Sequence, residues 1–216
     1  MKNAVIFDLD GTLLNTFDDL CDSTNYALTS CGFPTRTYEE VRSFVGNGIR
    51  LLIERAVPSG TEKEKVDECF NTFKAYYLTH SKIKTAPYNG VVDLLKTLKE
   101  QGYKTAIVSN KIQAGVDELV EEMFNGLVDI AVGERAGYRT KPDPDLVNIA
   151  IDYLDIDKKN AVYVGDSDVD VMTAKNSNLD MVAVTWGFRD KDFLKKHGAT
   201  TFIDTPNELL ALLKQL

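Results

Sequence analysis

A-V-I-F-D-L-D-G-T at residues 4–12 decides the fold predicted for this chain, because an apolar run there ends in two aspartates and turns at once through Gly11. The apolar run predicts a buried strand. Side chains two apart in a strand point to one side, so Asp8 and Asp10 should emerge together where the strand ends. Two converging carboxylates repel each other unless a cation or a phosphoryl group lies between them. The end of this strand is therefore a predicted place for chemistry.

Composition predicts a soluble, cytoplasmic protein. The 216 residues are 44% hydrophobic, which is enough for one domain, or for one domain with a sizeable insertion. No run of apolar residues approaches the length of a membrane span, and Lys2 is followed by a strand pattern instead of a signal peptide. The three cysteines form no C-x-x-C pair, which suits free thiols in a reducing compartment.

The charge balance bears on the partners of the chain. Lys and Arg total 25 against 33 Asp and Glu, a net charge of −8, which disfavours binding of nucleic acid over a broad surface. A phosphate group would have to be held locally, by backbone amides, a metal or a few cations. The expected partner is a small phosphorylated metabolite, and both a monomer and a homodimer remain open.

Helices without a convincing strand are predicted between the first strand and residue 85. Apolar residues at helical spacing indicate helices at 16–31, 38–45, 49–57 and 62–80. Glycines and prolines separate these segments. This stretch is therefore expected to be an all-helical insertion.

From residue 86 the pattern changes to alternating helices and strands. Asn89 is predicted to cap a helix over 90–101 that Gly102 closes, and a strand follows at 104–109. The remaining predictions are strands at 127–132, 160–165 and 180–184, and helices at 112–124, 144–154, 168–177 and 206–215. Such alternation indicates a parallel sheet with helices on both faces. We expect an α/β core of residues 1–14 and 86–216, interrupted by a helical domain at 15–85.

Four places at predicted strand ends carry chemistry. Ligands of open parallel sheets bind outside the carboxyl ends of the strands. These places are Asp8 with Asp10, Ser109 with Asn110, Lys141, and G-D-S-D-V-D at 165–170. Taken alone, S-N fits an ordinary turn and K-P-D-P an ordinary helix start. Their order along the chain and their common placement at strand ends indicate that they form one functional site.

Each of these residue types fits a step in removing a phosphoryl group. Asp8 is suited to attack phosphorus and form an aspartyl-phosphate, while Asp10 is suited to protonate the departing alcohol and later to activate water. A carboxylate and a phosphate dianion repel each other, so a cation must bridge them. Mg²⁺ is the natural candidate, with Asp8 and Asp166 as its carboxylates.

The other places supply phosphate contacts. The hydroxyl of Ser109 and an exposed backbone N–H at Asn110 can hold phosphate oxygens, and Lys141 adds a positive charge. Asp170, four residues after Asp166, is expected on the first turn of a helix, where it can orient Lys141 or a metal-bound water. Asp168 is expected to point elsewhere.

In these motifs the chain resembles the haloacid dehalogenase superfamily of phosphatases. The motifs occur in order as D-L-D-G-T at 8–12, S-N at 109–110, K-P at 141–142 and G-D-S-D-V-D at 165–170. The resemblance implies a Rossmann-like core, a helical cap domain inserted after the first strand, and an aspartyl-phosphate mechanism with Mg²⁺. The roles that it implies are a nucleophile and metal ligand at Asp8, an acid/base with a metal-binding carbonyl at Asp10, a metal ligand at Asp166, and phosphate-binding residues at Gly11, Thr12, Ser109, Asn110 and Lys141.

Two further segments bear on the substrate. F-V-G-N-G-I-R-L-L-I-E-R-A at 44–56 and T-W-G-F at 185–188 look like segments of phosphoglycolate phosphatases. Glycines on both sides of Asn47 would let the backbone approach a ligand, and Arg50 could bind a substrate carboxylate with two hydrogen bonds. The other interpretation of Arg50 is a solvated side chain near a helix cap. Related family members hydrolyse pyrophosphate, nucleotides or sugar phosphates, so those substrates stay open.

Two other functions remain as alternatives. A phosphotransferase similar to β-phosphoglucomutase would isomerise a sugar phosphate without releasing phosphate. A phosphate-sensing regulatory protein would also combine an acidic pocket, Mg²⁺ and a lysine on an α/β sheet. Asp10 argues against the sensor, because a long-lived phospho-aspartate gains nothing from an acid/base beside it.

Overall fold

The computed structural model describes residues 2–46 and 48–216 and divides the chain into two compact units. The first unit runs to Leu14 and resumes over Pro87–Leu216, and the second comprises Asn15–Ala86. The second crossing between the units thus falls one residue after the boundary expected from the sequence. None of the helices in the described part of the chain has the length and apolar content to span a membrane.

The first unit is built on a six-stranded sheet in the order β5-β4-β1-β6-β7-β8, and every neighbouring pair is parallel. Its strands are β1 (Ala4–Phe7), β4 (Lys104–Ile112), β5 (Ile130–Glu134), β6 (Ala161–Gly165), β7 (Asp180–Val184) and β8 (Phe202–Ile203). The predicted α/β class with a parallel sheet is therefore confirmed.

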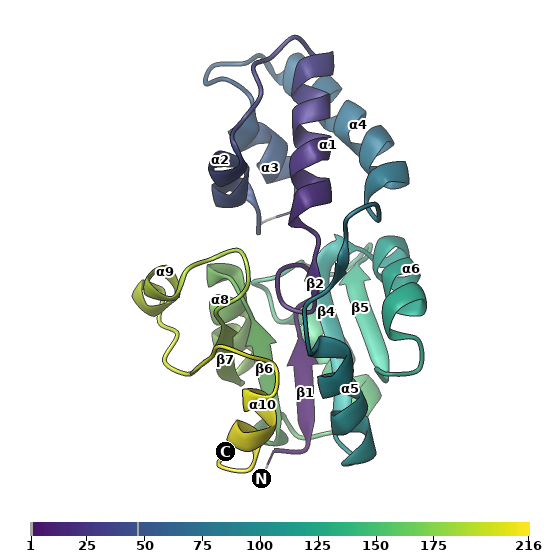
Figure 1. The fold of residues 1–216 in the computed structure, drawn as a ribbon, viewed down its shortest axis with the longest axis vertical. Coiled ribbons are helices and arrows are strands. Elements are labelled where there is room, and N and C mark those ends of the chain that lie inside the picture. Colours follow the sequence, from purple (N-terminus) through teal and green to yellow (C-terminus); the bar gives the residue numbers. More distant parts are fainter. Residues whose placement is uncertain (1, 47) are drawn as a thin grey trace. The chain divides into compact units, whose positions relative to one another are not determined.

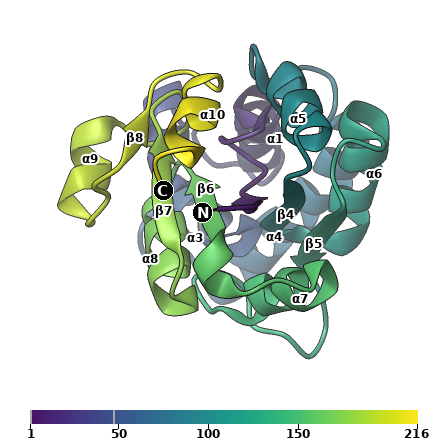
Figure 2. The same cartoon turned by 90° about the horizontal axis from the view of Figure 1, so that it is seen from below.

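Helices cover both faces of this sheet, as Figure 2 shows with α5 and α10 on one side of the strands and α7 and α8 on the other. Alternate residues of β1 explain the two layers: Val5 and Phe7 pack with α5, α6 and α10, whereas Ala4 and Ile6 pack with α7 and α8. The helices of this unit are α5 (Val91–Glu100), α6 (Gln113–Phe124), α7 (Asp145–Leu154), α8 (Asp168–Ser177), α9 (Lys191–Lys196) and α10 (Glu208–Leu213), with a 3₁₀ turn at Lys158–Asn160.

Strand register brings the predicted site motifs to one edge of the sheet. Phe7, the last residue of β1, pairs with Ile107 on one side and Val164 on the other. Because these strands are parallel, the residues after Phe7 and Val164, and those shortly after Ile107, emerge at the same carboxyl-end edge. This edge carries the candidate site.

The second unit is helical, with α1 (Phe17–Ser30), α2 (Tyr38–Phe44), α3 (Ile49–Ala56) and α4 (Lys63–His80) (Figure 1). Thr37 and Glu40 start α2 with a reciprocal capping box. The unit buries apolar side chains from α1, α3 and α4, among them Leu28, Ile53 and Phe73. Two short strands, β2 (Leu14–Asn15) and β3 (Ala86–Pro87), pair where the chain passes between the units.

The structure corrects several element predictions. The helix expected to be capped by Asn89 begins after Gly90, which takes a left-handed conformation with φ of 85° that suits glycine. The strand predicted at 104–109 continues to Ile112, because its last residue pairs with Glu134 after a shift in register. The strand predicted at 127–132 is observed at Ile130–Glu134, and the sequence reasoning missed β8 and α9.

Candidate active site

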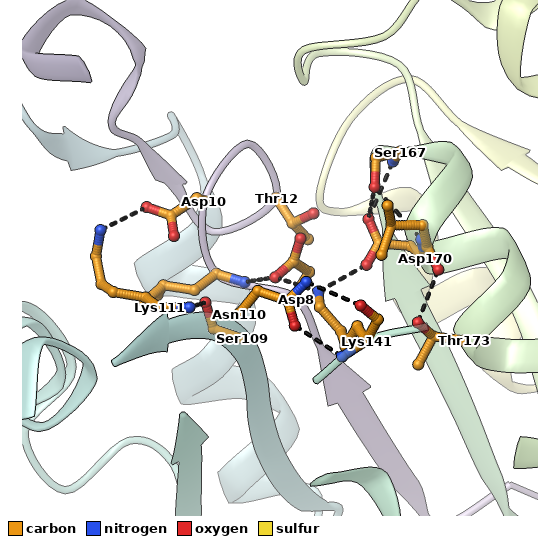
Figure 3. Close-up of polar contacts among 12 residues, drawn as sticks. Asp8, Asp10, Thr12, Ser109, Asn110, Lys111, Lys141, Ser167, Asp170 and Thr173 are labelled. Atoms are coloured by element: carbon orange, nitrogen blue, oxygen red, sulfur yellow. Dashed lines mark hydrogen bonds and ion pairs between the residues drawn. The ribbon is translucent and has the colours of Figure 1, made fainter. Parts of the chain in front are cut away.

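Asp8 follows β1 directly and lies at the centre of the site (Figure 3). Its side chain is 10% exposed, and its Oδ1 atom lies 2.7 Å from the Lys141 ammonium. The Leu9 backbone N–H donates to the same oxygen at 2.7 Å. Burial, followed by the negative charge of Asp170, raises the pKa of Asp8 well above its usual value although Lys141 acts in the opposite direction. The site therefore holds this carboxylate with little hydration.

Lys141 joins the two sides of the site. Its side chain is 3% exposed, and its ammonium contacts Asp8, Asp170 Oδ1 at 2.8 Å and the Tyr163 hydroxyl at 3.2 Å. Burial opposes the charged form, but the two carboxylates outweigh it and raise the pKa of Lys141 well above its usual value. The ammonium consequently stays charged at any physiological pH.

Asp170 lies in the first turn of α8 and has both oxygens occupied. Oδ1 accepts from Lys141 and from the Tyr163 hydroxyl at 3.1 Å. Oδ2 accepts from the Ser167 hydroxyl at 2.6 Å and from the backbone N–H groups of Ser167 and Asp166 at 3.0 and 3.2 Å. Burial opposes ionisation, yet Lys141 and these donors lower the pKa of Asp170. Asp170 therefore contacts Lys141 directly, and its expected role of orienting either Lys141 or a metal-bound water stays a prediction.

Asp166 is enclosed by the segments around Gly11 and Gly187. It accepts hydrogen bonds from the Thr12 hydroxyl at 3.1 Å and from the Phe188 N–H at 2.7 Å. A Cβ atom at Gly11, whose φ is +89°, would lie 2.4 Å from the carboxylate, and one at Gly187 would lie 2.2 Å from the Asp166 Cβ. Burial and the nearby charge of Asp170 raise the pKa of Asp166 to about 7. Both glycines are therefore needed for the carboxylate to fit.

The three aspartates form an oxygen site that suits a divalent cation. Asp8, Asp166 and Asp170 each offer an oxygen, and these oxygens lie within 4.8 Å of one another. Three buried carboxylates exceed the single charge of Lys141, and the raised pKa values of Asp8 and Asp166 report that excess. Because Asp170 is already saturated, Asp8 and Asp166 are the residues suited to bind a metal. An all-oxygen donor set favours a hard cation.

Asp10 points away from this cluster toward Lys111 (Figure 3). Its Oδ1 atom lies 3.3 Å from the Lys111 ammonium, in an ion pair instead of a directed hydrogen bond. The side chain of Asp10 is 20% exposed and that of Lys111 only 9%. Asp8 and Asp10 thus leave the same strand end but have different cationic partners.

Ser109 and Asn110 follow the middle of β4 and support the site through the backbone. The Ser109 hydroxyl oxygen accepts the Lys111 N–H at 3.1 Å. Asn110 makes two hydrogen bonds to the backbone of Lys141, at 2.8 and 3.1 Å. The Asn110 side chain therefore places the Lys141 segment, and the predicted phosphate contact through its backbone N–H remains a prediction.

The sequence also predicted two site residues in the helical unit, Asn47 and Arg50. Asn47 lies outside the described residues. Arg50, in the first turn of α3, forms ion pairs with Glu54 at 2.6 Å and Asp67 at 2.5 Å, and its guanidinium lies over the Phe70 ring. Arg50, which the sequence predicted to bind the substrate, therefore already pairs with two carboxylates of its own unit.

Sequence reasoning missed two contributors, Tyr163 and Lys111, and singled out the segment 185–188 without its contacts. Tyr163 lies in a strand that was predicted as apolar, so its hydroxyl was overlooked, although a tyrosine between buried valines is a recognisable polar exception. Lys111 directly follows the S-N motif and was not weighed. The Trp186 indole N–H donates to the Thr12 carbonyl at 3.0 Å, so the segment 185–188 holds the Gly11 turn as well as Asp166.

Comparisons with known proteins agree with this geometry. The family model of haloacid dehalogenase-like hydrolases matches residues 5–184. The chain is similar to phosphoglycolate phosphatase 1 of Pseudomonas aeruginosa (33% identity over 100% of this chain and 81% of that protein) and to a phosphoglycolate phosphatase of Colwellia psychrerythraea (30% identity over 99% and 98%).

A solved structure extends the similarity to the whole fold. A candidate phosphoglycolate phosphatase from Lactobacillus delbrueckii subsp. bulgaricus superposes with a TM-score of 0.94 at 38% identity, over 99% of both chains. The family model and the relatives cover the strand ends that carry the aspartates and Lys141. The chain therefore belongs to the haloacid dehalogenase-like hydrolase family and is an enzyme of the phosphatase class.

Proposed function

We propose that the chain is a Mg²⁺-dependent phosphomonoesterase that hydrolyses 2-phosphoglycolate to glycolate and phosphate through an aspartyl-phosphate on Asp8. The observation that carries this proposal is the buried Asp8 carboxylate, which Lys141 holds at 2.7 Å beside Asp166 at the carboxyl edge of the sheet. The substrate is inferred from the names of the curated relatives.

Asp8 acts as the nucleophile. The contacts of Asp8 with the Lys141 ammonium and the Leu9 N–H both fall on Oδ1, so Oδ2 is the oxygen suited to attack. A bond forms between Oδ2 and phosphorus as the bond from phosphorus to the alcohol oxygen breaks. Lys141 offsets the negative charge of carboxylate and phosphate as they approach. The covalent intermediate divides one slow hydrolysis into two faster displacements.

Asp10 acts as the acid and then as the base. It gives a proton to the departing glycolate oxygen and, in the second step, takes one from the attacking water. As the water oxygen bonds to phosphorus, the bond between Oδ2 of Asp8 and phosphorus breaks, which releases phosphate and restores the Asp8 carboxylate. This role needs a carboxylate next to Asp8 but outside the metal cluster, and the contact of the Asp10 side chain with Lys111 supports it. A protein that only senses phosphate would not need this second carboxylate.

Asp8, Asp166 and the backbone carbonyl of Asp10 would hold Mg²⁺. When bound, Mg²⁺ offsets the charge of the phosphate and so lets an anionic nucleophile approach it. Asp170 keeps Lys141 aligned from behind the site. We further propose that the Asn15–Ala86 unit is the cap domain, which selects the substrate, and that the other unit is the catalytic core.

The test is phosphate release with Mg²⁺ from 2-phosphoglycolate, pyrophosphate, a nucleoside monophosphate and a sugar phosphate. We expect a preference for 2-phosphoglycolate and a loss of about 10⁴-fold or more in kcat with Asp8→Asn, because the nucleophile is removed. Asp93→Asn is the matched control, since Asp93 lies exposed on α5. Near-normal turnover by Asp8→Asn would refute the mechanism, and a preference for another substrate would refute only the substrate.

A further inference from the structure

Lys111 is a nearly buried lysine that the steps above use only as a neighbour of Asp10. It lies near the end of β4, two residues after Ser109, and its side chain is 9% exposed. Long cationic side chains are rarely buried, because removing the ammonium from water is costly without an anionic partner. Its position beside the proposed acid/base therefore calls for a function.

The framework of the core unit fixes where this ammonium lies. The Lys111 N–H donates to the Ser109 hydroxyl oxygen at 3.1 Å. A Cβ atom at Gly133 would lie 2.7 Å from the Lys111 carbonyl oxygen, so β5 approaches this residue as closely as a backbone can. A Cβ atom at Gly115 would lie 3.4 Å from the aliphatic stem. Neighbours on three elements thus define the path of the side chain toward Asp10.

We propose that Lys111 binds the carboxylate of the substrate's leaving group, releasing Asp10 as it does so. This inference rests on the proposed function, in which Asp10 protonates the glycolate oxygen. That oxygen must lie within about 3 Å of the Asp10 carboxylate, and the carboxylate of glycolate begins only two bonds further on. Because the Lys111 ammonium lies 3.3 Å from Asp10 Oδ1, the substrate carboxylate comes within reach of it.

When the substrate carboxylate replaces Asp10 as the partner of Lys111, binding of the substrate also prepares the chemical step. A leaving group with a carboxylate competes with Asp10 for the ammonium, and Asp10 is then free to turn toward the leaving oxygen. A neutral leaving group offers no competing anion, so Asp10 stays paired with Lys111. The same contact therefore favours acidic substrates in binding and in the chemical step.

Lys141 and Arg50, two other cations that could bind the substrate carboxylate, each pair with two carboxylates of the protein. Lys141 contacts both Asp8 and Asp170 and serves the phosphate side of the site. Arg50, the ligand predicted from the sequence for a substrate carboxylate, is paired with Glu54 and Asp67. Lys111 is instead paired with Asp10, the side chain that must turn toward the leaving oxygen during the reaction.

The experiment compares 2-phosphoglycolate with 2-hydroxyethyl phosphate, which has the same phosphate and chain length but no carboxylate. We measure kcat and KM for both with wild type, Lys111→Gln and Lys111→Arg. Lys96→Gln, on the exposed side of α5, is the matched control. We expect Lys111→Gln to lose roughly 10- to 100-fold in kcat/KM for 2-phosphoglycolate, as for a lost charged hydrogen bond. We expect no more than about a threefold loss with 2-hydroxyethyl phosphate, and retention of most of the preference by Lys111→Arg.

The outcomes separate this inference from the proposed function. Equal losses on both substrates would show that Lys111 only positions Asp10, and would overturn the inference. Unchanged discrimination in Lys111→Gln, with discrimination lost in Arg50→Gln, would assign the carboxylate to Arg50 instead. Failure of the proposed function would appear in the wild type itself, as no preference for 2-phosphoglycolate. Lys111→Met keeps the buried stem and replaces the Gln variant if that variant is unstable.

Discussion

Two ion-pair clusters in this molecule each join one cation to two carboxylates, but one cluster is buried and the other is exposed. In the core unit Lys141 contacts Asp8 and Asp170 at 2.7 and 2.8 Å, and in the helical unit Arg50 contacts Glu54 and Asp67 at 2.6 and 2.5 Å. The side chains of the first cluster are 0–10% exposed, whereas those of the second are 38–44% exposed. The distances are nearly equal, so burial distinguishes the clusters.

Burial changes what an ion pair does. Water screens exposed charges and can replace a lost partner, so such pairs contribute little to stability. A buried charge that loses its partner keeps the cost of its removal from water. The core cluster is therefore sensitive to every change, and its unbalanced carboxylates are ready to bind a cation. The Arg50 cluster is expected to tolerate substitution.

The largest expected effect is that of Asp170→Ala. This change removes one of the two carboxylates from Lys141 and leaves the Tyr163 and Ser167 donors without their acceptor. We expect a loss of about 3–5 kcal/mol in the free energy of unfolding, measured by urea denaturation. Asp67→Ala is the matched change in the exposed cluster and should shift the midpoint much less. Equal shifts in the two variants would mean that burial is not the deciding difference.

A smaller effect is expected from pH and divalent cation together. Burial and the charge of Asp170 raise the pKa of Asp166 to about 7 in the folded state, against 3.8 for an exposed aspartate. Between these values the folded state binds a proton that the unfolded state has lost, so metal-free stability should fall as pH rises from about 4 to 7. One such group contributes at most about 1.4 kcal/mol per pH unit.

Mg²⁺ should reverse this loss, because a bound cation offsets the charge of the Asp8 and Asp166 carboxylates after they lose their protons. We expect the rise in melting temperature on adding Mg²⁺ to be larger at pH 8 than at pH 5.5. Asp166→Asn should weaken the pH dependence in this range, to which Asp8 also contributes, and should remove most of the response to Mg²⁺. A melting temperature that rises with pH in the metal-free protein would contradict the assignment.

The smallest expected effect on stability is that of Arg50→Gln. Its partners are exposed, so the melting temperature should change by no more than about 2 °C, and by less at high salt. Kinetics of the same variant test the sequence-based prediction that Arg50 binds substrate. An increase in KM for 2-phosphoglycolate with little change in folding would support that role, and unchanged kinetics would leave Arg50 as a surface ion pair.

The fold could be predicted largely because its signals are local. Apolar runs and helical spacing identify β1, β6 and the four helices of the inserted unit within a few residues. The predictions failed where tertiary contacts override local preference. β4 continues past Ser109 because Glu134 pairs with Ile112, and α5 starts after a left-handed Gly90, so Asn89 is not its cap.

The site was predictable in its members and less so in its connections. Asp8 and Asp166 follow predicted strands, Asp170 lies at the start of a predicted helix, and the parallel register brings these strand ends together. Lys141 lies in the segment between β5 and α7 and contacts Asp8 and Asp170 from there. The contact of Asp170 with Lys141 was among the expectations, but most of the other contact partners could not be foreseen. Asn110 bonding the Lys141 backbone and Lys111 pairing with Asp10 depend on side-chain directions across different elements.

The sequence by itself determined the alternating α/β core, the helical insertion and the order of the acidic and basic groups at strand ends, because these depend on residue type and periodicity along the chain. Only the tertiary structure decided which carboxylates are buried together, which of them Lys141 neutralises, and which of them keep a raised pKa. Those properties depend on distances and water exclusion between different segments of the chain. No pattern along one segment contains that information.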